Sequence, residues 1–448
     1  MTARNRHGKE WESVAVVGLG YVGLGLAAAF GRRLRTVGFD LDEERVSELS
    51  RKIDRNGELE PSMLAVPNLA FEANAEAIRD ADAIVVAVPT PIDESHQPDC
   101  SFLVSASTIV GKEIALRRGA DSKPIVIYES TVYPGCTEEL CIPILEDESG
   151  LRAGIDFFVA YSPERTNFGD QSHGLNNVVK VVAGQDEATT DAVADLYGMI
   201  VEAGIHRAPN IRTAEAAKVI ENVQRDVNIA LMNELAMIFH RLDLDTSAVL
   251  DAASTKWNFM RYEPGLVGGH CIPVDPYYLS YKAQEVGHDA ELILSGRKIN
   301  ESIPEFITTE IKSILKRSGR SLAEVRVLVL GIAFKPNIRD ARNTKAADLG
   351  RKLAEAGAQV RVHDPLVAPE TIAGLGLDRV ADPFSSGSRY EVLVLAVNHD
   401  VFLDRPVDDI LELLDVSAEP DKLGMLVDVG GNLDLSEQQL ASVDYWTL

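Results

Sequence analysis

The stretch Gly18-Leu19-Gly20-Tyr21-Val22-Gly23 follows an apolar run at 14–17 and opens a helical stretch that extends to about Arg33. A second apolar run, at 36–39, ends on Asp40. This order is the dinucleotide-binding fingerprint, in which the first glycine makes the turn, the second lets a pyrophosphate approach and the third lets helix pack on strand. The sequence therefore predicts a strand–turn–helix–strand unit for a dinucleotide.

The acid after the second run predicts which dinucleotide binds. A carboxylate at Asp40 would accept hydrogen bonds from ribose hydroxyls and repel a 2′-phosphate, so NAD is favoured over NADP. Asp42 is the alternative acid, and the nearby cation Arg45 leaves NADP as the alternative cofactor.

Further apolar runs alternate with helical stretches such as 102–117, which indicates an α/β fold with a parallel, doubly wound sheet. The predicted strands are 83–88, 125–129, 157–160 and 178–183. Polar turns follow three of them, at 89–91, 130–135 and 161–165. Because parallel strands end at one edge, where ligands bind, we expect these turns to line a site. The predicted cofactor contacts are Gly18, Gly20, Tyr21, Val22, Gly23, Asp40, Arg45, Pro89, Thr90, Ser130 and Thr131.

Composition excludes several classes of protein. The net charge of −25, from 69 acidic and 44 basic side chains, disfavours nucleic acid and anionic membranes as partners. Four cysteines without a CxxC pair indicate neither a disulfide framework nor a metal site, and they favour a reducing, cytoplasmic compartment. The apolar run 14–30 resembles a secretory signal, but glycines at 18, 20, 23 and 25 favour folded protein.

A long stretch without Gly or Pro, 213–242, predicts a helix that joins domains and contacts a second copy of the chain. Lys218 and Asn222 lie four residues apart and therefore share one face of this helix. The surrounding residues are mostly Ala, Val and Ile, so we expect the Lys218 ammonium to be partly desolvated.

The motif Gly268-Gly269-His270-Cys271 places a thiol in a tight loop, with Asp275 four residues further on. A thiolate in such a loop can attack carbon, although a lone cysteine is often a buried apolar residue.

A second strand–helix–strand pattern begins at 325–330 and continues with a helix at 344–356 and a strand at 359–363, which ends on Asp364. It lacks GxGxxG, and its first loop, 334–342, instead carries the cations Lys335, Arg339 and Arg342. Cations at a strand end beside a helix N-terminus favour phosphate. We therefore predict two Rossmann-like domains, 1–208 and 319–448, joined by a helical domain at 209–318.

Two nucleotide-type domains and a thiol indicate oxidation of an alcohol through the aldehyde to the acid, because only the second step needs a nucleophile. The predicted catalytic residues are Cys271 as nucleophile, Lys218 and Asn222 at the oxyanion, and Glu164, Thr131 and Asp275 for water and protons.

The chain resembles the UDP-glucose/GDP-mannose 6-dehydrogenase family over nearly its whole length. The motifs that carry the resemblance are GLGYVG at 18–23, STVYPG at 130–135, SPER at 162–165, AAKVIEN at 216–222, GLVGGHCIPVDPYYL at 265–279 and FKPNIRDAR at 334–342. The resemblance implies two NAD per sugar, a UDP-binding C-terminal domain, dimerisation through the central domain and the catalytic roles given above. It also implies substrate contacts at Glu164, Arg165, Lys218, Asn222, Gly268, Lys335 and Arg342.

Within the family, the segment 255–259 and GLVGGHC look most like members that oxidise UDP-N-acetylhexosamines (UDP-GlcNAc or UDP-GalNAc) for surface polysaccharides. Phe168-Gly169 departs from the Pro-Gly expected there, which leaves the choice of sugar open. The alternatives are a UDP-glucose or UDP-N-acetylmannosamine 6-dehydrogenase, a single-step β-hydroxyacid dehydrogenase, and a non-catalytic nucleotide-sugar sensor.

Overall fold

The computed structural model of the chain describes residues 3–57, 59–117, 123–166, 174–415 and 424–448. The chain forms two compact units, which are Met1–Glu221 with Tyr277–Asp289, and Asn222–Pro276 with Ala290–Leu448. The predicted long helix is confirmed as α7 (Ile211–Arg241), which continues from the first unit into the second.

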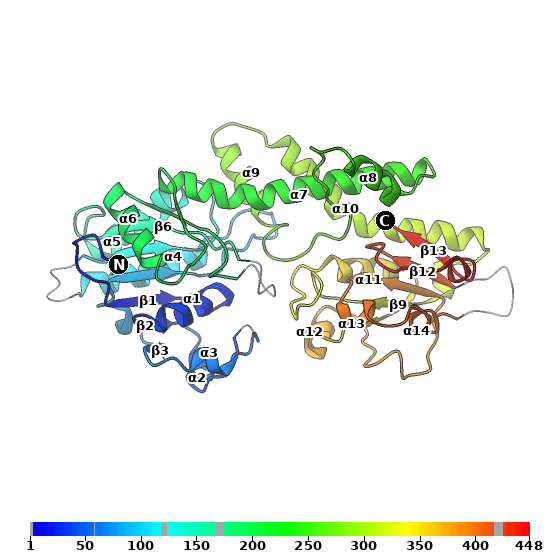
Figure 1. Cartoon of the computed structure of the whole chain (residues 1–448), viewed down its shortest axis with the longest axis horizontal. Helices are drawn as coiled ribbons and strands as arrows, with labels where there is room; N and C mark the ends of the chain where they lie inside the picture. Colours follow the sequence, from blue (N-terminus) through cyan, green and yellow to red (C-terminus); the bar gives the residue numbers. More distant parts are fainter. Residues whose placement is uncertain (1–2, 58, 118–122, 167–173, 416–423) are drawn as a thin grey trace. The chain divides into compact units, whose positions relative to one another are not determined.

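The first unit is built on an eight-stranded sheet with the order β3-β2-β1-β4-β5-β6-β7-β8. Its strands are β1 (Ser13–Val17), β2 (Arg35–Phe39), β3 (Leu69–Glu72), β4 (Ala83–Val86), β5 (Ile125–Tyr128), β6 (Phe158–Tyr161), β7 (Lys180–Gly184) and β8 (Ile205–Arg207). Figure 1 shows β1, β2 and β3 side by side. The predicted parallel, doubly wound sheet is confirmed, except that β7 runs antiparallel to β6. Antiparallel neighbours need no crossover helix between them.

Alternate residues of each central strand enter different cores, as expected for a sheet covered on both faces. In β1, Val14 and Val16 pack in the core that holds Phe30 of α1 (Tyr21–Gly31). Ala15 and Val17 pack in the core that holds Leu103 and Val110 of α4 (Ser101–Ala115). The other helices of this unit are α2 (Glu43–Ser50), α3 (Pro61–Leu64), α5 (Ile142–Ser149), α6 (Glu187–Tyr197) and most of α9 (Asp275–Glu285).

The second unit is built on a five-stranded parallel sheet with the order β10-β9-β11-β12-β13. Its strands are β9 (Arg326–Leu330), β10 (Gln359–His363), β11 (Val392–Leu395), β12 (Met425–Asp428) and β13 (Asp444–Thr447). The edge strand β13 was not predicted, because it is short and lacks an apolar run. Two cores again lie on opposite faces: Val327 and Val329 pack with α10 (Glu291–Arg317), and Leu328 and Leu330 enter the other core. The remaining helices are α8 (Thr246–Ser254), α11 (Lys345–Glu355), α12 (Pro369–Gly374), α13 (Asp400–Leu403), α14 (Val407–Leu411) and α15 (Glu437–Leu440).

The three tryptophans have very different surroundings. Trp11 in the first unit and Trp446 in the second are 4% and 7% exposed, and Trp446 stacks on His240 with ring centroids 5.0 Å apart. Trp257, in the segment after α8, is 92% exposed. None of the described helices combines the length and apolar character that crossing a membrane requires.

Candidate functional site

The glycine-rich turn after β1 has a geometry that only small residues allow. Gly18 has φ +92°, and a Cβ there would lie 2.8 Å from the Ala87 carbonyl oxygen. A Cβ on Gly23 would lie 1.8 Å from the Gly18 carbonyl oxygen, so helix and turn touch at this point. Gly20 is the N-cap of α1, which starts at Tyr21. Apart from its two chain neighbours, no described heavy atom lies within 4 Å of the Cβ position of Gly20, so this residue leaves the helix N-terminus accessible.

Asp40, and not Asp42, reaches this turn. The Asp40 carboxylate accepts a hydrogen bond from Leu19 N at 2.7 Å, whereas Asp42 is the N-cap of α2 and accepts from Arg45 N at 3.0 Å. The Arg45 guanidinium is buried, where it pairs with Asp54 at 2.7 Å and donates to the Leu19 carbonyl at 3.2 Å. Arg45 therefore supports the turn from behind, and its direct contact with a cofactor stays a prediction.

The three predicted polar turns follow β4, β5 and β6, which are parallel neighbours, so the turns share one edge of the sheet as predicted. Ser130 Oγ donates to the Val88 carbonyl at 2.6 Å, and Tyr161 Oη donates to the Ser130 carbonyl at 3.2 Å. The turn with Pro89 and Thr90 is thereby joined to the turn with Ser130 and Thr131.

The third turn is held by its own side chains. The Glu164 carboxylate accepts from Arg165 N at 2.6 Å and from Thr166 N. The Arg165 guanidinium pairs with Glu221 of α7 at 2.7 Å and donates to the Val179 carbonyl at 2.6 Å. Phe168, the departure from the family pattern, lies outside the described residues.

A buried ion pair beneath these turns was not predicted. Lys180 Nζ lies 2.6 Å from the Glu129 carboxylate and donates to the Pro163 carbonyl at 2.9 Å, while Tyr197 Oη donates to the other Glu129 oxygen. Glu129 and Lys180 are 1% and 3% exposed. Burial raises the pKa of the Glu129 carboxyl, and the Lys180 ammonium opposes that rise. A Glu that ends one predicted strand, 125–129, and a Lys inside another, 178–183, were the available signals.

Lys218 and Asn222 are each 7% exposed, so the predicted desolvation of Lys218 is confirmed. Asn222 Nδ2 donates to the Asp275 carboxylate at 2.6 Å, and Asp275 is 2% exposed. Asp275 is the first residue of α9. The structure therefore brings together two predicted site residues that lie 53 positions apart.

Cys271 is half-buried and lies just before α9. Its carbonyl accepts hydrogen bonds from Val274 N at 3.0 Å and Asp275 N at 2.8 Å, which close a turn around the residue. The start of the loop is held by Asn233 of α7, whose amide accepts from Gly265 N at 2.8 Å and donates to the Gly265 carbonyl at 3.1 Å.

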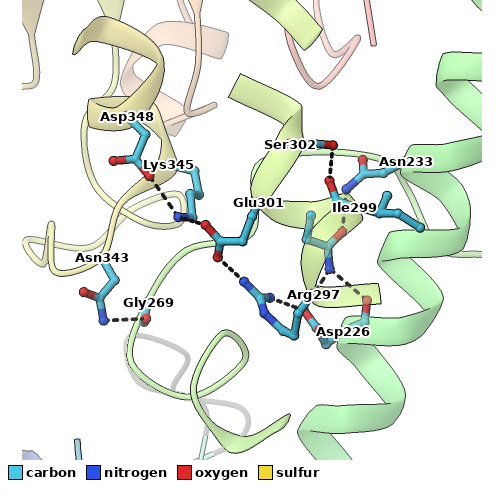
Figure 2. Close-up of polar contacts among 11 residues, drawn as sticks. Asp226, Asn233, Gly269, Arg297, Ile299, Glu301, Ser302, Asn343, Lys345 and Asp348 are labelled. Carbon is cyan, nitrogen blue, oxygen red and sulfur yellow. Dashed lines mark hydrogen bonds and ion pairs between the residues drawn. The ribbon is translucent and has the colours of Figure 1, made fainter. Parts of the chain in front are cut away.

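A polar network supports Asn233 from below (Figure 2). Asn233 donates to Asn300 at 2.8 Å, and Asn300 donates to the Asp226 carboxylate at 2.8 Å. Asp226 also pairs with Arg297 at 2.5 Å, and both are almost completely buried. Figure 2 shows that Glu301 continues this chain from Arg297 to Lys345, at the start of α11. Helices α7, α10 and α11 are thus tied together around the base of the Cys271 loop.

The loop after β9 carries Lys335 and Arg342. Arg342 pairs with Asp340 at 2.6 Å, and its side chain is 51% exposed. Asn337 N donates to His399 Nδ1 at 2.8 Å, and His399 Nε2 lies 3.0 Å from the Asp364 carboxylate. His399 and Asp364 are fully buried, and neither was predicted as a site residue.

The Asp364 carboxylate supports this loop. One of its oxygens accepts from Ile332 N at 2.7 Å and Ala333 N at 3.0 Å. Burial alone would raise the pKa of Asp364, but hydrogen bonds from His399 and Ile332 N lower it well below its usual range. The buried acid is therefore an ionised anchor for the loop.

The predicted residues fall in two sets. The first unit contains the glycine-rich turn, Asp40, Arg45, Pro89, Thr90, Ser130, Thr131, Glu164, Arg165 and Lys218, and the second contains Asn222, Gly268, Cys271, Asp275, Lys335 and Arg342. The hydrogen bonds and ion pairs given above join residues within each of the two sets.

Three family models match the chain in order. The NAD binding domain of the UDP-glucose/GDP-mannose dehydrogenase family matches residues 12–201. The central domain of the same family matches 212–302, and its UDP binding domain matches 328–424.

Individual proteins are similar over most of the chain. UDP-N-acetyl-D-glucosamine 6-dehydrogenase of Pseudomonas aeruginosa is 48% identical over 403 residues, which are 89% of this chain and 93% of that protein. Protein CapL of Staphylococcus aureus is 46% identical over 437 residues, which are 97% and 99% of the two chains. Among solved structures, UDP-D-ManNAc dehydrogenase from Pyrococcus horikoshii superposes with a TM-score of 0.84 at 27% identity, covering 97% of this chain and 98% of that one.

Proposed function

Because the chain belongs to the UDP-glucose/GDP-mannose dehydrogenase family, we propose that it oxidises the C6 alcohol of a UDP-N-acetylhexosamine to the uronic acid. Membership makes it an NAD-dependent nucleotide-sugar dehydrogenase, and the choice of UDP-GlcNAc or UDP-GalNAc is the proposal. The name of the Pseudomonas relative supports this choice. We assign the product to the synthesis of surface polysaccharides.

The first unit fits NAD at the N-terminus of α1. Among the described residues no side chain caps this terminus, and the accessible side of Gly20 admits a pyrophosphate. Asp40 would accept from the ribose hydroxyls, and the turns at Pro89, Thr90, Ser130 and Thr131 would line the same edge. NAD, when bound, accepts hydride, and the full oxidation of alcohol to acid consumes two NAD per sugar.

Cys271 would act as the nucleophile. Its thiolate would add to the C6 carbon of the aldehyde to give a thiohemiacetal, which would become a thioester by losing a hydride from C6, for which bound NAD is the acceptor, and a proton from its hydroxyl. Water then attacks the thioester carbon, the C–S bond breaks, and the acid and the free thiol are released. The position of Cys271 before α9 supports this role, because the positive end of a helix stabilises a thiolate.

Lys218 and Asn222 would stabilise the oxyanion that forms on the sugar. A buried ammonium is a strong electrostatic partner for a developing alkoxide, because little water competes with it. Glu164, Thr131 and Asp275 would position water and carry protons. The observation that carries this part is the 2.6 Å hydrogen bond from Asn222 to Asp275, because it fastens the proposed oxyanion donor to the Cys271 loop.

The second unit would hold the UDP group. Lys335 and Arg342 would contact the phosphates, and Gly268, Arg165 and Glu164 would contact the sugar. We retain the division into domains 1–208, 209–318 and 319–448 as part of the proposal, and the three family matches support it.

We also propose a homodimer formed through α7. Leu231 and Ile238 of α7 are 48% and 43% exposed and their spacing places them on one side of the helix, and Leu242, just after its end, is 60% exposed. Light scattering after gel filtration should give twice the chain mass, and a monomer would exclude this arrangement. Four free cysteines support the proposed cytoplasmic location.

The decisive experiment offers UDP-GlcNAc, UDP-GalNAc, UDP-ManNAc and UDP-glucose with NAD and counts NADH formed per sugar. We expect two NADH per N-acetylhexosamine and no acid from Cys271→Ala, which should still bind both ligands. One NADH per sugar would indicate the single-step dehydrogenase, and binding without NADH would indicate the sensor. Normal uronate formation by Cys271→Ala would exclude the thioester route.

A further inference from the structure

The loop that carries Cys271 is packed directly on the loop that carries Arg342, within the second unit. A Cβ on Gly268 would lie 2.8 Å from the Asn343 carbonyl oxygen, and one on Gly269 would lie 2.8 Å from the Phe334 ring. Asn343 Nδ2 also donates to the Gly269 carbonyl at 3.2 Å (Figure 2). The two glycines therefore allow close contact between the two loops.

His270, the residue next to Cys271, lies on this contact. Its ring meets Phe334 edge to face, with centroids 5.5 Å apart. His270 Nε2 lies 3.4 Å from Arg342 Nη2, and Nδ1 lies 3.8 Å from the Asp340 carboxylate. A guanidinium can only donate, so Nε2 accepts and the ring hydrogen lies on Nδ1, facing Asp340.

Asp340 and His270 are both partners of Arg342, whose side chain is half-exposed. A diphosphate would compete for this guanidinium, because phosphate oxygens accept bidentate hydrogen bonds from arginine. When the guanidinium turns to phosphate, His270 Nε2 loses its contact with Arg342, and the adjacent Cys271 loses the support that this contact gives to its loop.

We propose that His270 is a positioning residue that transmits binding of the nucleotide diphosphate at Arg342 to the thiol of Cys271. The inference rests on the proposed function, because it takes Arg342 as a phosphate contact. In the absence of nucleotide, His270 holds the Cys271 loop against the 334–344 loop. Nucleotide binding releases this hold, so the thiol becomes reactive when a substrate is present to receive it.

The test follows the alkylation rate of Cys271 by iodoacetamide, measured on its peptide by mass spectrometry, with and without UDP. UDP is the probe because it has the diphosphate but lacks the hexose that would cover the thiol. Wild type should be alkylated at least about threefold faster with UDP, and His270→Ala should show the same rate with and without it, while calorimetry still detects UDP binding. His270→Gln, which can still accept a hydrogen bond, should keep the acceleration.

His288→Ala is the matched control, because His288 is exposed, outside the proposed site and in the other unit, and it should behave as wild type. An acceleration in His270→Ala equal to that of wild type, or its loss in His270→Gln, would overturn the role of His270. A wild type that binds UDP without any change at Cys271 would also overturn it while leaving the proposed function intact. Failure of wild type to bind UDP would instead refute the proposed function.

Discussion

The sheets of the two units have similar turns after their first strands, β1 and β9. The acids that follow their second strands, β2 and β10, differ in their surroundings. Gly18 after β1 has φ +92°, and Gly331 after β9 has φ +85°. Each glycine N–H donates to the last residue of the neighbouring strand, Phe39 at 2.9 Å and His363 at 2.8 Å. Each also faces a carbonyl that follows the strand on its other side. The turn at the switch point of the sheet is therefore the same device in both units.

The acids that follow the second strands have different tasks. Asp40 accepts Leu19 N and remains partly exposed, so it can also meet a ribose. Asp364 is fully buried, and its oxygens accept four backbone N–H groups besides facing His399. An acid at this position is therefore evidence for ribose binding only when it keeps an exposed face.

The largest effect is expected from a substitution at Gly23 in α1. Gly23→Ala would put a Cβ 1.8 Å from the Gly18 oxygen, so we expect a loss of about 3 kcal/mol or more in the free energy of unfolding, and no measurable NAD binding. UDP binding by the second unit should persist. Gly25→Ala, in the same helix with open space around it, should be neutral or stabilising, as read by thermal unfolding. NAD binding by Gly23→Ala would show that the turn tolerates the cofactor without this packing.

Asp364→Asn tests the buried acid. Replacing an ionised acceptor of several N–H groups should cost about 3 kcal/mol of stability, whereas Asp40→Asn should cost less than about 1 kcal/mol. The folded-state pKa of Asp364 lies below its ordinary 3.8, so its stabilising contribution is present above that pH and is lost as the pH falls below it. Urea unfolding followed by circular dichroism from pH 2.5 to 6 should therefore show a flatter acid limb in Asp364→Asn. An unchanged limb would mean that His399 alone fixes the loop.

Two substitutions separate the contributions of the two hydrogen bonds that His399 makes. Asparagine places its oxygen near the position of Nδ1 and can accept from Asn337 N, whereas glutamine places its amide near Nε2 and keeps the contact with Asp364. Because Asn337 lies between Lys335 and Arg342, we expect His399→Gln to raise the KM for the UDP-sugar about tenfold, with His399→Asn within about threefold of wild type. The KM for NAD should not change in either variant. Equal KM values in the two would contradict a role through Asn337.

The smallest effect is expected at Asp40, the partly exposed acid. Asp40→Asn should raise the KM for NAD about fivefold, or about 1 kcal/mol, and should reduce the preference for NAD over NADP because a charge that repels the 2′-phosphate is lost. Asp42→Asn is the control, since asparagine is as good an N-cap as aspartate. Initial rates with both cofactors measure this. A larger effect at Asp42 would assign the ribose to that residue.

The sequence predicted most of the fold, because apolar runs and helical stretches alternate and the runs are buried on both faces. It also predicted the turn at Gly18 and the acids at both strand ends. It did not predict that Asp364 is buried, because the partner that encloses it, His399, lies 35 residues away. The periodicity and spacing of residues in a sequence indicate local structure. They do not indicate which side chain from a distant segment will lie beside a given residue.

The same reason explains the other omissions at the site. Glu129 ends the predicted strand 125–129 and Lys180 lies inside the predicted strand 178–183, and neither position indicated that the two side chains are buried as a pair with Tyr197. The prediction for the 268–271 loop rested on its two glycines and on Cys271. His270 lies between them and received no predicted role, because its contacts with Phe334 and Arg342 are found only in the structure.

The contrast among the three indoles gives the protein built-in optical reporters. Trp11 and Trp446 lie in separate units and are shielded, so the emission of each will follow the melting of its own half. Trp257 stands almost wholly in water and will be the first to lose its emission to iodide. Replacing one tryptophan at a time with phenylalanine would show, by fluorescence, which unit a bound ligand stabilises against unfolding.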